Sequence, residues 1–201
     1  SVGYSLNCHF VECLIDELAA AASIKPLDYR AKLLARAGAH EPARRAAKLL
    51  EKMAEFDKAN ARGPTSDGVK AGRGFALTQS FHSFVGEIAD VEIVQGEIKV
   101  RRVHAVVDCG FAIDPPNVVA QIRSGINYGL TAALYGRVDI ENGRIVQTNF
   151  DGYPLLSLDS APTISVEILN SGAAIGGVGE IGTPAIAPAV ANAIFAATGR
   201  R

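Results

Sequence analysis

Apolar residues recur every three to four positions through the first third of the chain, a spacing that predicts amphipathic helices. One helix precedes Pro26, a second runs from about Pro26 to Gly38, and a third runs from about Glu41 to Gly63-Pro64. We expect one apolar stripe of the first helix and one of the third to be buried. The stripes are Phe10, Val11, Leu14, Ile15, Leu18 and Ala22 in the first helix, and Ala46, Leu49, Leu50, Met53 and Phe56 in the third.

After Gly72 the apolar period falls to two, which predicts strands. Strands within residues 74–94 and 97–108 flank a tight turn at Gln95-Gly96. The second strand changes phase near Arg101 and Arg102, which fits a β-bulge. Ile98 and Val100 lie on one face of the expected strand, and Val103, Ala105 and Val107 on the other.

Helical spacing returns at residues 118–136 and again before Gly199, where the last helix should stop. Between these helices, Asn142-Gly143 predicts a hairpin with a type I′ turn. Residues 163–169 alternate as a strand, with Ile164, Val166 and Ile168 facing inward.

The order of these elements favours an α+β fold, because the strands are linked by hairpins and do not alternate regularly with helices. We expect an N-terminal helical segment, residues 1–64, followed by mixed or antiparallel strands packed with helices in residues 65–201.

Composition excludes several function classes. Twenty Lys and Arg oppose 21 Asp and Glu, so no basic footprint indicates a nucleic-acid partner. No apolar run approaches the roughly 18 to 20 residues of a membrane span. The chain starts at Ser1 without a signal-peptide h-region, which indicates an excised piece or a processed product, and its compartment is left open.

The three cysteines, Cys8, Cys13 and Cys109, form no disulfide framework. His9 lies one helical turn before Cys13, so a metal pair is conceivable, but no second ligand cluster follows. We expect small core side chains here and no metal site.

One carboxylate, Glu180, stands in a stretch rich in glycine. Gly176, Gly177 and Gly179 allow close approach to a ligand, and the flanking residues are apolar. Loss of water favours the neutral form of a carboxyl group and could prepare it for proton abstraction. A glycine turn with Glu180 in solvent explains the same residues equally well.

A second candidate site lies on the helix within residues 118–136. Gln121 and Gly125 share one side of it, with Gly129 one turn later, and glycines at helical spacing favour close approach of a backbone or a ligand. A primary amide suits the edge of a heterocycle. Packing of a helix on a sheet, with Gln121 on the surface, is the competing interpretation. Asp108-Cys109-Gly110 and Asp114 are explained by a turn and a helix cap, and neither His82 nor His104 supports a nucleophilic triad.

Taken in order, these segments resemble the C-terminal part of molybdenum hydroxylase large subunits, the xanthine dehydrogenase and aldehyde oxidase family. The resemblance spans the stretch "SFVGEIADVEI…VRRVHAVVDCGFAIDPPNVVAQIRSGINYGL" and the stretch "GGVGEIGTPAIAPAVANAIFAATGRR". The opening "SVGYSLNCHFVECLIDELAAAASIKPLDYRAKLL" is similar to the bacterial isoquinoline 1-oxidoreductase branch.

The resemblance implies a role for each candidate residue. Glu180 matches the family's general base beside the molybdenum, and Gln121 matches the glutamine that hydrogen-bonds the molybdopterin. Gly125 and Gly179 are implied cofactor contacts, and Val2 and Gly3 match the end of a segment that passes the active site. Arg123 departs from the family motif, where this position is acidic.

The same resemblance implies the cofactor and the partners. The cofactor is molybdopterin, in its cytosine dinucleotide form, and iron–sulfur clusters lie on a small partner subunit. The other partners are the remainder of the large subunit and an aromatic heterocycle or aldehyde that is hydroxylated with water as the oxygen source. Two alternatives are a non-catalytic scaffold or assembly module that retains the fold, and a different small-molecule binding protein.

Overall fold

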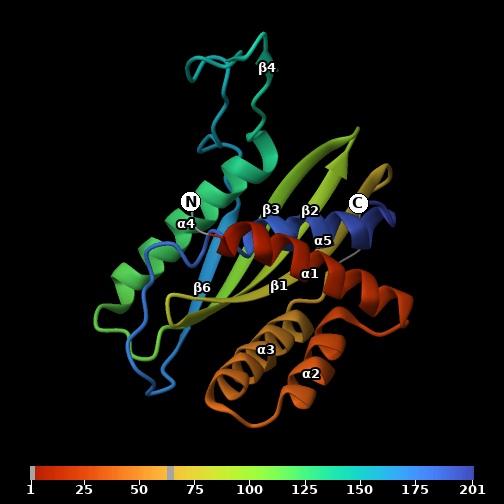
Figure 1. Ribbon diagram of the computed structural model, residues 1–201. Helices are drawn as coiled ribbons and strands as arrows, with labels where there is room; N and C mark the ends of the chain where they lie inside the picture. The colour runs from red at the N-terminus through yellow and green to blue at the C-terminus, as the bar shows by residue number, and fades with distance from the viewer. Residues whose placement is uncertain (1–2, 63–65) are drawn as a thin grey trace.

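The computed structural model describes residues 3–62 and 66–201. Three helices come first, a three-stranded meander follows, and two further helices enclose a small hairpin and a last strand (Figure 1). The third helix ends at Ala59, four residues before Gly63, where its end was predicted; Gly63-Pro64 itself lies outside the described residues. The elements are α1 (Tyr4–Ala21), α2 (Pro26–Ala37), α3 (Glu41–Ala59), β1 (Val69–Ser80), β2 (Ser83–Val94), β3 (Glu97–Asp108), α4 (Pro115–Tyr135), β4 (Ile140–Glu141), β5 (Arg144–Ile145), β6 (Thr163–Leu169) and α5 (Ile186–Thr198).

The main sheet has the order β1-β2-β3-β6, in which β1 to β3 are antiparallel and β6 runs parallel to β3. It is therefore a mixed sheet covered by helices on both faces, and the predicted α+β class is confirmed. One face packs against α1, α4 and α5, and the other packs against α2 and α3. The boundary expected at residue 64 stays a prediction.

The turns and the bulge lie where the sequence predicts them. Gln95-Gly96 and Asn142-Gly143 both have positive φ at the two positions, as type I′ turns require. The register of β2 and β3 shifts so that Arg101 is the extra residue, between the pairs Asp90–Arg102 and Val91–Val100. The bulge corrects one expectation: Val100 packs in the same core as Val103, Ala105 and Val107, because the extra residue restores the phase.

The buried face of α1 is not the predicted one. Phe10, Leu14 and Leu18 of the apolar stripe are 68%, 55% and 45% exposed, whereas Glu12 and Asp16 are buried. Arg30 of α2 explains this reversal, since it pairs with Glu12 Oε2 at 2.8 Å and with Asp16 Oδ1 at 2.6 Å. Carboxylates such as Glu12 and Asp16 ordinarily lie in solvent. Here the Arg30 guanidinium from another helix pairs with both, so they remain buried.

Helix α5 lies directly on β1 because that strand carries two glycines. A Cβ at Gly74 would lie 2.0 Å from the Ala189 carbonyl oxygen, and one at Gly72 would lie 1.8 Å from that of Ala193. This close packing places α5, the last helix of the chain, against β1 and next to α1. Because α5 is held against β1, the loop that precedes α5 is also held at the end of the sheet.

Glu87, in the middle of β2, is fully buried on the face that packs against α1, α4 and α5. Neither carboxylate oxygen has a hydrogen-bond partner among the residues that the structure describes. Burial therefore raises the pKa of Glu87 well above its ordinary value, and the group is held as a neutral acid over a wide pH range.

Replacement of Glu87 by glutamine is expected to stabilise the protein progressively as the pH rises above 4.5. The folded state retains the proton where the unfolded state loses it, so the contribution of Glu87 to wild-type stability falls by about 1.4 kcal/mol per pH unit in that range. Glutamine has no proton to lose. Urea unfolding at pH 5, 6 and 7 should give a difference between variant and wild type that grows with pH, while the exposed control Glu51→Gln stays level. A constant difference for Glu87→Gln would contradict the neutral buried acid.

Candidate functional site

The glycine-rich loop after β6 is fixed to the end of the sheet by its own backbone. Gly176 N–H donates to the Cys109 carbonyl at 3.0 Å, and Gly177 N–H donates to the Phe81 carbonyl at 2.8 Å. A Cβ at Gly176 would lie 2.2 Å from Ser83 Oγ. These two glycines therefore serve the packing of the loop against the β1–β2 turn, and a ligand is not needed to explain them.

Gly179 and Glu180 differ from the glycines that precede them. A Cβ at Gly179 would meet no atom of the described residues within 4 Å, so this glycine faces open space. Val178 and Ile181 turn into the core on either side, and Ile181 is fully buried. Glu180 consequently points outward and is exposed, so within these 201 residues the structure agrees with the second of the two interpretations left open by the sequence.

Helix α4 lies opposite the loop that carries Glu180 and forms the other side of the candidate site. Its N-terminus is capped by Asp114, whose Oδ1 accepts from Asn117 N–H at 3.2 Å. A Cβ at Gly125 would lie 3.2 Å from Gly182 Cα, and Thr183 Oγ1 donates to the Gly125 carbonyl at 3.1 Å. The close approach expected at Gly125 is present, and the group that approaches is the backbone of the loop that follows Glu180.

A pocket of about 320 Å³ opens between this loop, α4 and the start of α1. It brings together Gly125, Gly179 and Glu180 of the four predicted site residues. Gln121 lies one helical turn before Gly125, is exposed, and does not line the pocket. The lining residues are Ser5, Ser124, Gly125, Tyr128, Gly179, Glu180, Thr183 and Pro184.

Four hydroxyl-bearing residues in that lining were not singled out by sequence reasoning. Tyr128 is 74% exposed, and Ser124 sits on the same side of α4 one turn before it. Ser5 comes from the first turn of α1, which supports the expectation that the start of the chain passes near the site. Val2 lies outside the described residues. The signal available in the sequence was a tyrosine among glycines on a helix face.

Asp108, at the end of β3, joins the segments that lead to the pocket. Its Oδ2 accepts from Arg45 Nε at 2.7 Å, and its Oδ1 accepts from Gly110 N–H at 2.8 Å and Ser171 Oγ at 2.7 Å. Burial alone would raise the pKa of Asp108, but these hydrogen bonds outweigh it, so the pKa is lowered and the group is ionised. Asp108 therefore connects α3, the end of β3 and the loop that carries Glu180. The sequence predicted only a turn residue at this position.

The remaining candidates take structural positions. Cys8 is buried, and burial raises the pKa of its thiol to about 12. The Cys13 Sγ lies 4.0 Å from His9 Nε2, and no group of three potential ligands forms within residues 3–62 and 66–201. His104 is buried and stacked on the Phe56 ring, and burial lowers its pKa to about 4. No helix in the described ranges is long and apolar enough to cross a membrane.

Comparison with known proteins supplies the family. The family model described as "Molybdopterin cofactor-binding domain" matches residues 8–162. The chain belongs to this family. The molybdopterin cofactor-binding domain match ends before Glu180, so the glycine loop itself lies outside it.

Curated relatives are enzymes of several kinds. The chain is 31% identical over 191 residues to the beta chain of isoquinoline 1-oxidoreductase of Brevundimonas diminuta, covering 94% of this chain and 24% of that one. It is 32% identical over 206 residues to a nicotinate dehydrogenase subunit of Pseudomonas putida, covering 94% and 17%. The chain therefore spans about a quarter or less of the length of these relatives.

The fold has a close counterpart among solved structures. The aldehyde oxidoreductase from Desulfovibrio gigas superimposes with a TM-score of 0.82 at 12% identity, over 99% of this chain and 39% of that one. This likeness supports the α+β architecture of a molybdopterin cofactor-binding domain.

The residues at the pocket fit one side of such a cofactor. Gly179 leaves open space beside Glu180, where a larger side chain would project into the opening. The exposed amide of Gln121 has no hydrogen bond to another described residue and is free to donate and accept.

Proposed function

We propose that the chain is part of a molybdenum-dependent oxidoreductase that hydroxylates an aromatic N-heterocycle or an aldehyde with water as the oxygen source. The observation that carries this proposal is the pocket that Gly125, Gly179 and Glu180 line together, in a chain of the molybdopterin cofactor-binding domain family. The names of two relatives, which refer to isoquinoline and nicotinate, favour a heterocyclic substrate.

In this proposal each residue has one task. Glu180 is the general base, because it is the only carboxylate among the described residues that line the pocket. The Gln121 amide hydrogen-bonds the pterin, while Gly125 and Gly179 keep side chains out of the space it occupies. The bound molybdopterin, in its cytosine dinucleotide form, supplies the redox centre that accepts two electrons from the substrate. The remainder of the large subunit covers Glu180 and excludes water from it.

The test is purification of the full-length protein together with its small iron–sulfur subunit. We expect about one molybdenum per large subunit and oxidation of at least one of isoquinoline, quinoline, nicotinate or an aromatic aldehyde. A protein that folds in molybdenum-replete cells but carries neither molybdenum nor pterin would contradict the proposal, and would favour a scaffold that retains the fold.

Replacement of Gln121 by alanine in that full-length protein should loosen the cofactor without unfolding the domain. The side chain is exposed and makes no hydrogen bond to the described residues, so its loss costs about 1 kcal/mol of cofactor binding, roughly a fivefold change. The measurement is the rate at which molybdenum is lost during dialysis. Gln147→Ala, which follows the β4–β5 hairpin and removes an amide that bonds, among the described residues, only to Asp139, is the control. Equal rates of loss in both variants would remove Gln121 from the cofactor site.

A further inference from the structure

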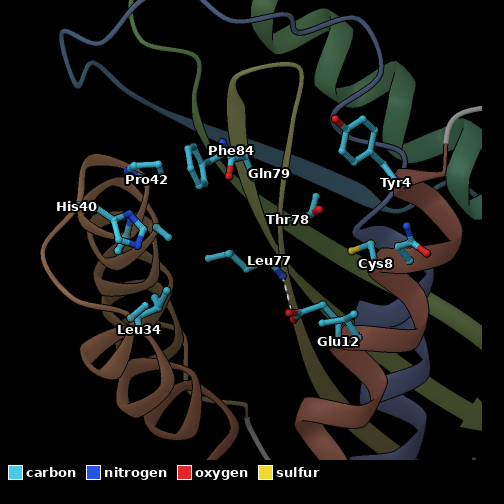
Figure 2. Close-up of a pocket in the computed structure, with 15 residues that line it drawn as sticks. Tyr4, Cys8, Glu12, Leu34, His40, Pro42, Leu77, Thr78, Gln79 and Phe84 are labelled. Atoms are coloured by element: carbon cyan, nitrogen blue, oxygen red, sulfur yellow. Dashed lines mark hydrogen bonds between the residues drawn. The ribbon is translucent and has the colours of Figure 1, made fainter.

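A groove of about 420 Å³ lies along the β1 edge of the main sheet and shares no lining residue with the pocket at Glu180. Its floor is the end of β1, one of the two edge strands in the order β1-β2-β3-β6. Helix α1 forms one wall and the α2–α3 pair forms the other (Figure 2). Since these helices cover opposite faces of the sheet, the groove continues the plane of the sheet itself.

The backbone of β1 presents unused hydrogen-bonding groups to this groove. Leu77 N–H donates to Glu12 Oε2 at 3.0 Å, so the backbone groups of Leu77 face away from β2. The backbone N–H and C=O groups of successive residues in an edge strand point alternately toward the neighbouring strand and away from it. Those of Gln79, two residues after Leu77, therefore also face the groove. The Leu77 carbonyl and the Gln79 N–H and carbonyl bond to no side chain or loop in the part of the chain that the structure describes. An edge strand left in this state is a template for another strand.

The same edge is closed on one side of this opening. The Phe75 carbonyl accepts from Arg30 at 3.2 Å and from Asn192 at 2.9 Å, and Arg30 is held there by Glu12. Side chains of the described residues thus provide hydrogen-bond partners for the β1 edge from the Phe75 carbonyl to the Leu77 N–H, and for none of its outward-facing backbone groups between there and Gln79. The open section spans Leu77 to Gln79, which suits a short extended segment.

The walls show what side chains such a segment would carry. Leu77 points toward α2 and α3, and Thr78 points toward α1, as alternation along a strand requires (Figure 2). Apolar side chains predominate on both walls, including Val11 on α1 and Leu34 on α2. The described lining of the groove holds no unpaired carboxylate, because Glu12 is paired with Arg30. A segment with small or medium apolar residues at alternate positions fits both walls.

We propose that a short extended segment from the remainder of the same polypeptide adds to β1 as a fifth strand, pairing with Leu77 and Gln79. Three quarters or more of the length of the curated relatives lies outside the region matched by this chain, so the polypeptide has ample length to supply it. Two apolar side chains of the α1 wall, Tyr4 and Val11, are 42% and 53% exposed, which indicates that the groove is covered by further protein. The inference depends on family membership and on the sheet edge, and it holds whatever the role of Glu180.

Residue-resolved hydrogen exchange on the full-length large subunit tests the pairing. The Gln79 amide is expected to exchange at least 100-fold more slowly than an unstructured amide, in the large subunit on its own and independently of its concentration. Exchange at the unstructured rate would overturn the proposal. Protection that grows with concentration would assign the groove to a second copy, and protection that needs the iron–sulfur subunit would assign it to that chain; both results would overturn it.

Two variants separate main-chain pairing from side-chain contact. Gln79→Pro removes the N–H that faces the groove while leaving the β1–β2 ladder intact, whereas Gln79→Ala retains the N–H. In the full-length large subunit, Gln79→Pro should speed exchange at the paired amides of the added segment tenfold or more, and Gln79→Ala should not. A Gln79→benzoylphenylalanine variant should cross-link within one chain, to a residue outside these 201. Equal exchange in both variants, or cross-links only between chains, would contradict the assignment.

Discussion

Replacement of Glu180 by glutamine in the full-length enzyme is expected to lower turnover by about 10²- to 10⁴-fold, the usual contribution of a positioned general base. Glutamine keeps the size of the side chain but cannot accept a proton at neutral pH. The hydrogen bonds that hold the loop, donated by the N–H groups of Gly176, Gly177 and Thr183, are made between backbone groups and remain intact when the Glu180 side chain changes. Molybdenum content should therefore stay at the wild-type level while turnover collapses.

The matched control is Glu97→Gln, an exposed glutamate at the start of β3, far from the pocket. It carries the same change of charge and should leave turnover unchanged. Normal molybdenum with normal turnover in Glu180→Gln would show that the glycine loop is structural and that the base lies elsewhere. Loss of molybdenum together with turnover would indicate that Glu180 helps to hold the cofactor, and would contradict its role as base alone.

Local patterns in the sequence predicted most of the fold. Two-residue hairpin turns need positive φ at both positions; Asn142-Gly143 is the favoured pair for such a turn, and Gly96 supplies the second position of the turn at Gln95-Gly96. The bulge at Arg101 was visible as a change of phase in the apolar pattern. Residues close together in the chain determine such features, so they can be predicted from a single sequence.

Long-range pairing was the part that could not be predicted. Glu12 and Asp16 are buried only because Arg30 reaches them from another helix, so the periodicity of α1 indicated the wrong face. The candidate site shows the same division. Glycine spacing predicted close approach at Gly125, but the approaching group is the backbone at Gly182, which is 57 positions later in the chain.

The Arg45–Asp108 pair is the long-range contact with the greatest consequence for the site. Arg45 reaches from α3 to the end of β3, where its side chain is 9% exposed and that of Asp108 is 2% exposed. Arg45 also donates to the Asp108 carbonyl at 3.1 Å and to the His82 carbonyl at 3.2 Å. The loop that carries Glu180 rests on the same carboxylate through Ser171, so the pair supports both the core and the pocket.

Replacement of Arg45 by methionine should destabilise the protein by about 3–5 kcal/mol at neutral pH, because it leaves the Asp108 carboxylate buried without its cation. The Arg45→Met/Asp108→Asn double variant should recover part of that loss, since no buried charge remains. The pKa of Asp108 is lowered in the folded protein, so its contribution is present above about pH 3.8 and is lost as the pH falls through the folded value. Urea unfolding should therefore show a gap between wild type and Arg45→Met that is full at pH 7 and narrows as the pH falls and Asp108 is protonated. A gap under about 1 kcal/mol at pH 7, or no recovery in the double variant, would show that the pair does not hold the loop.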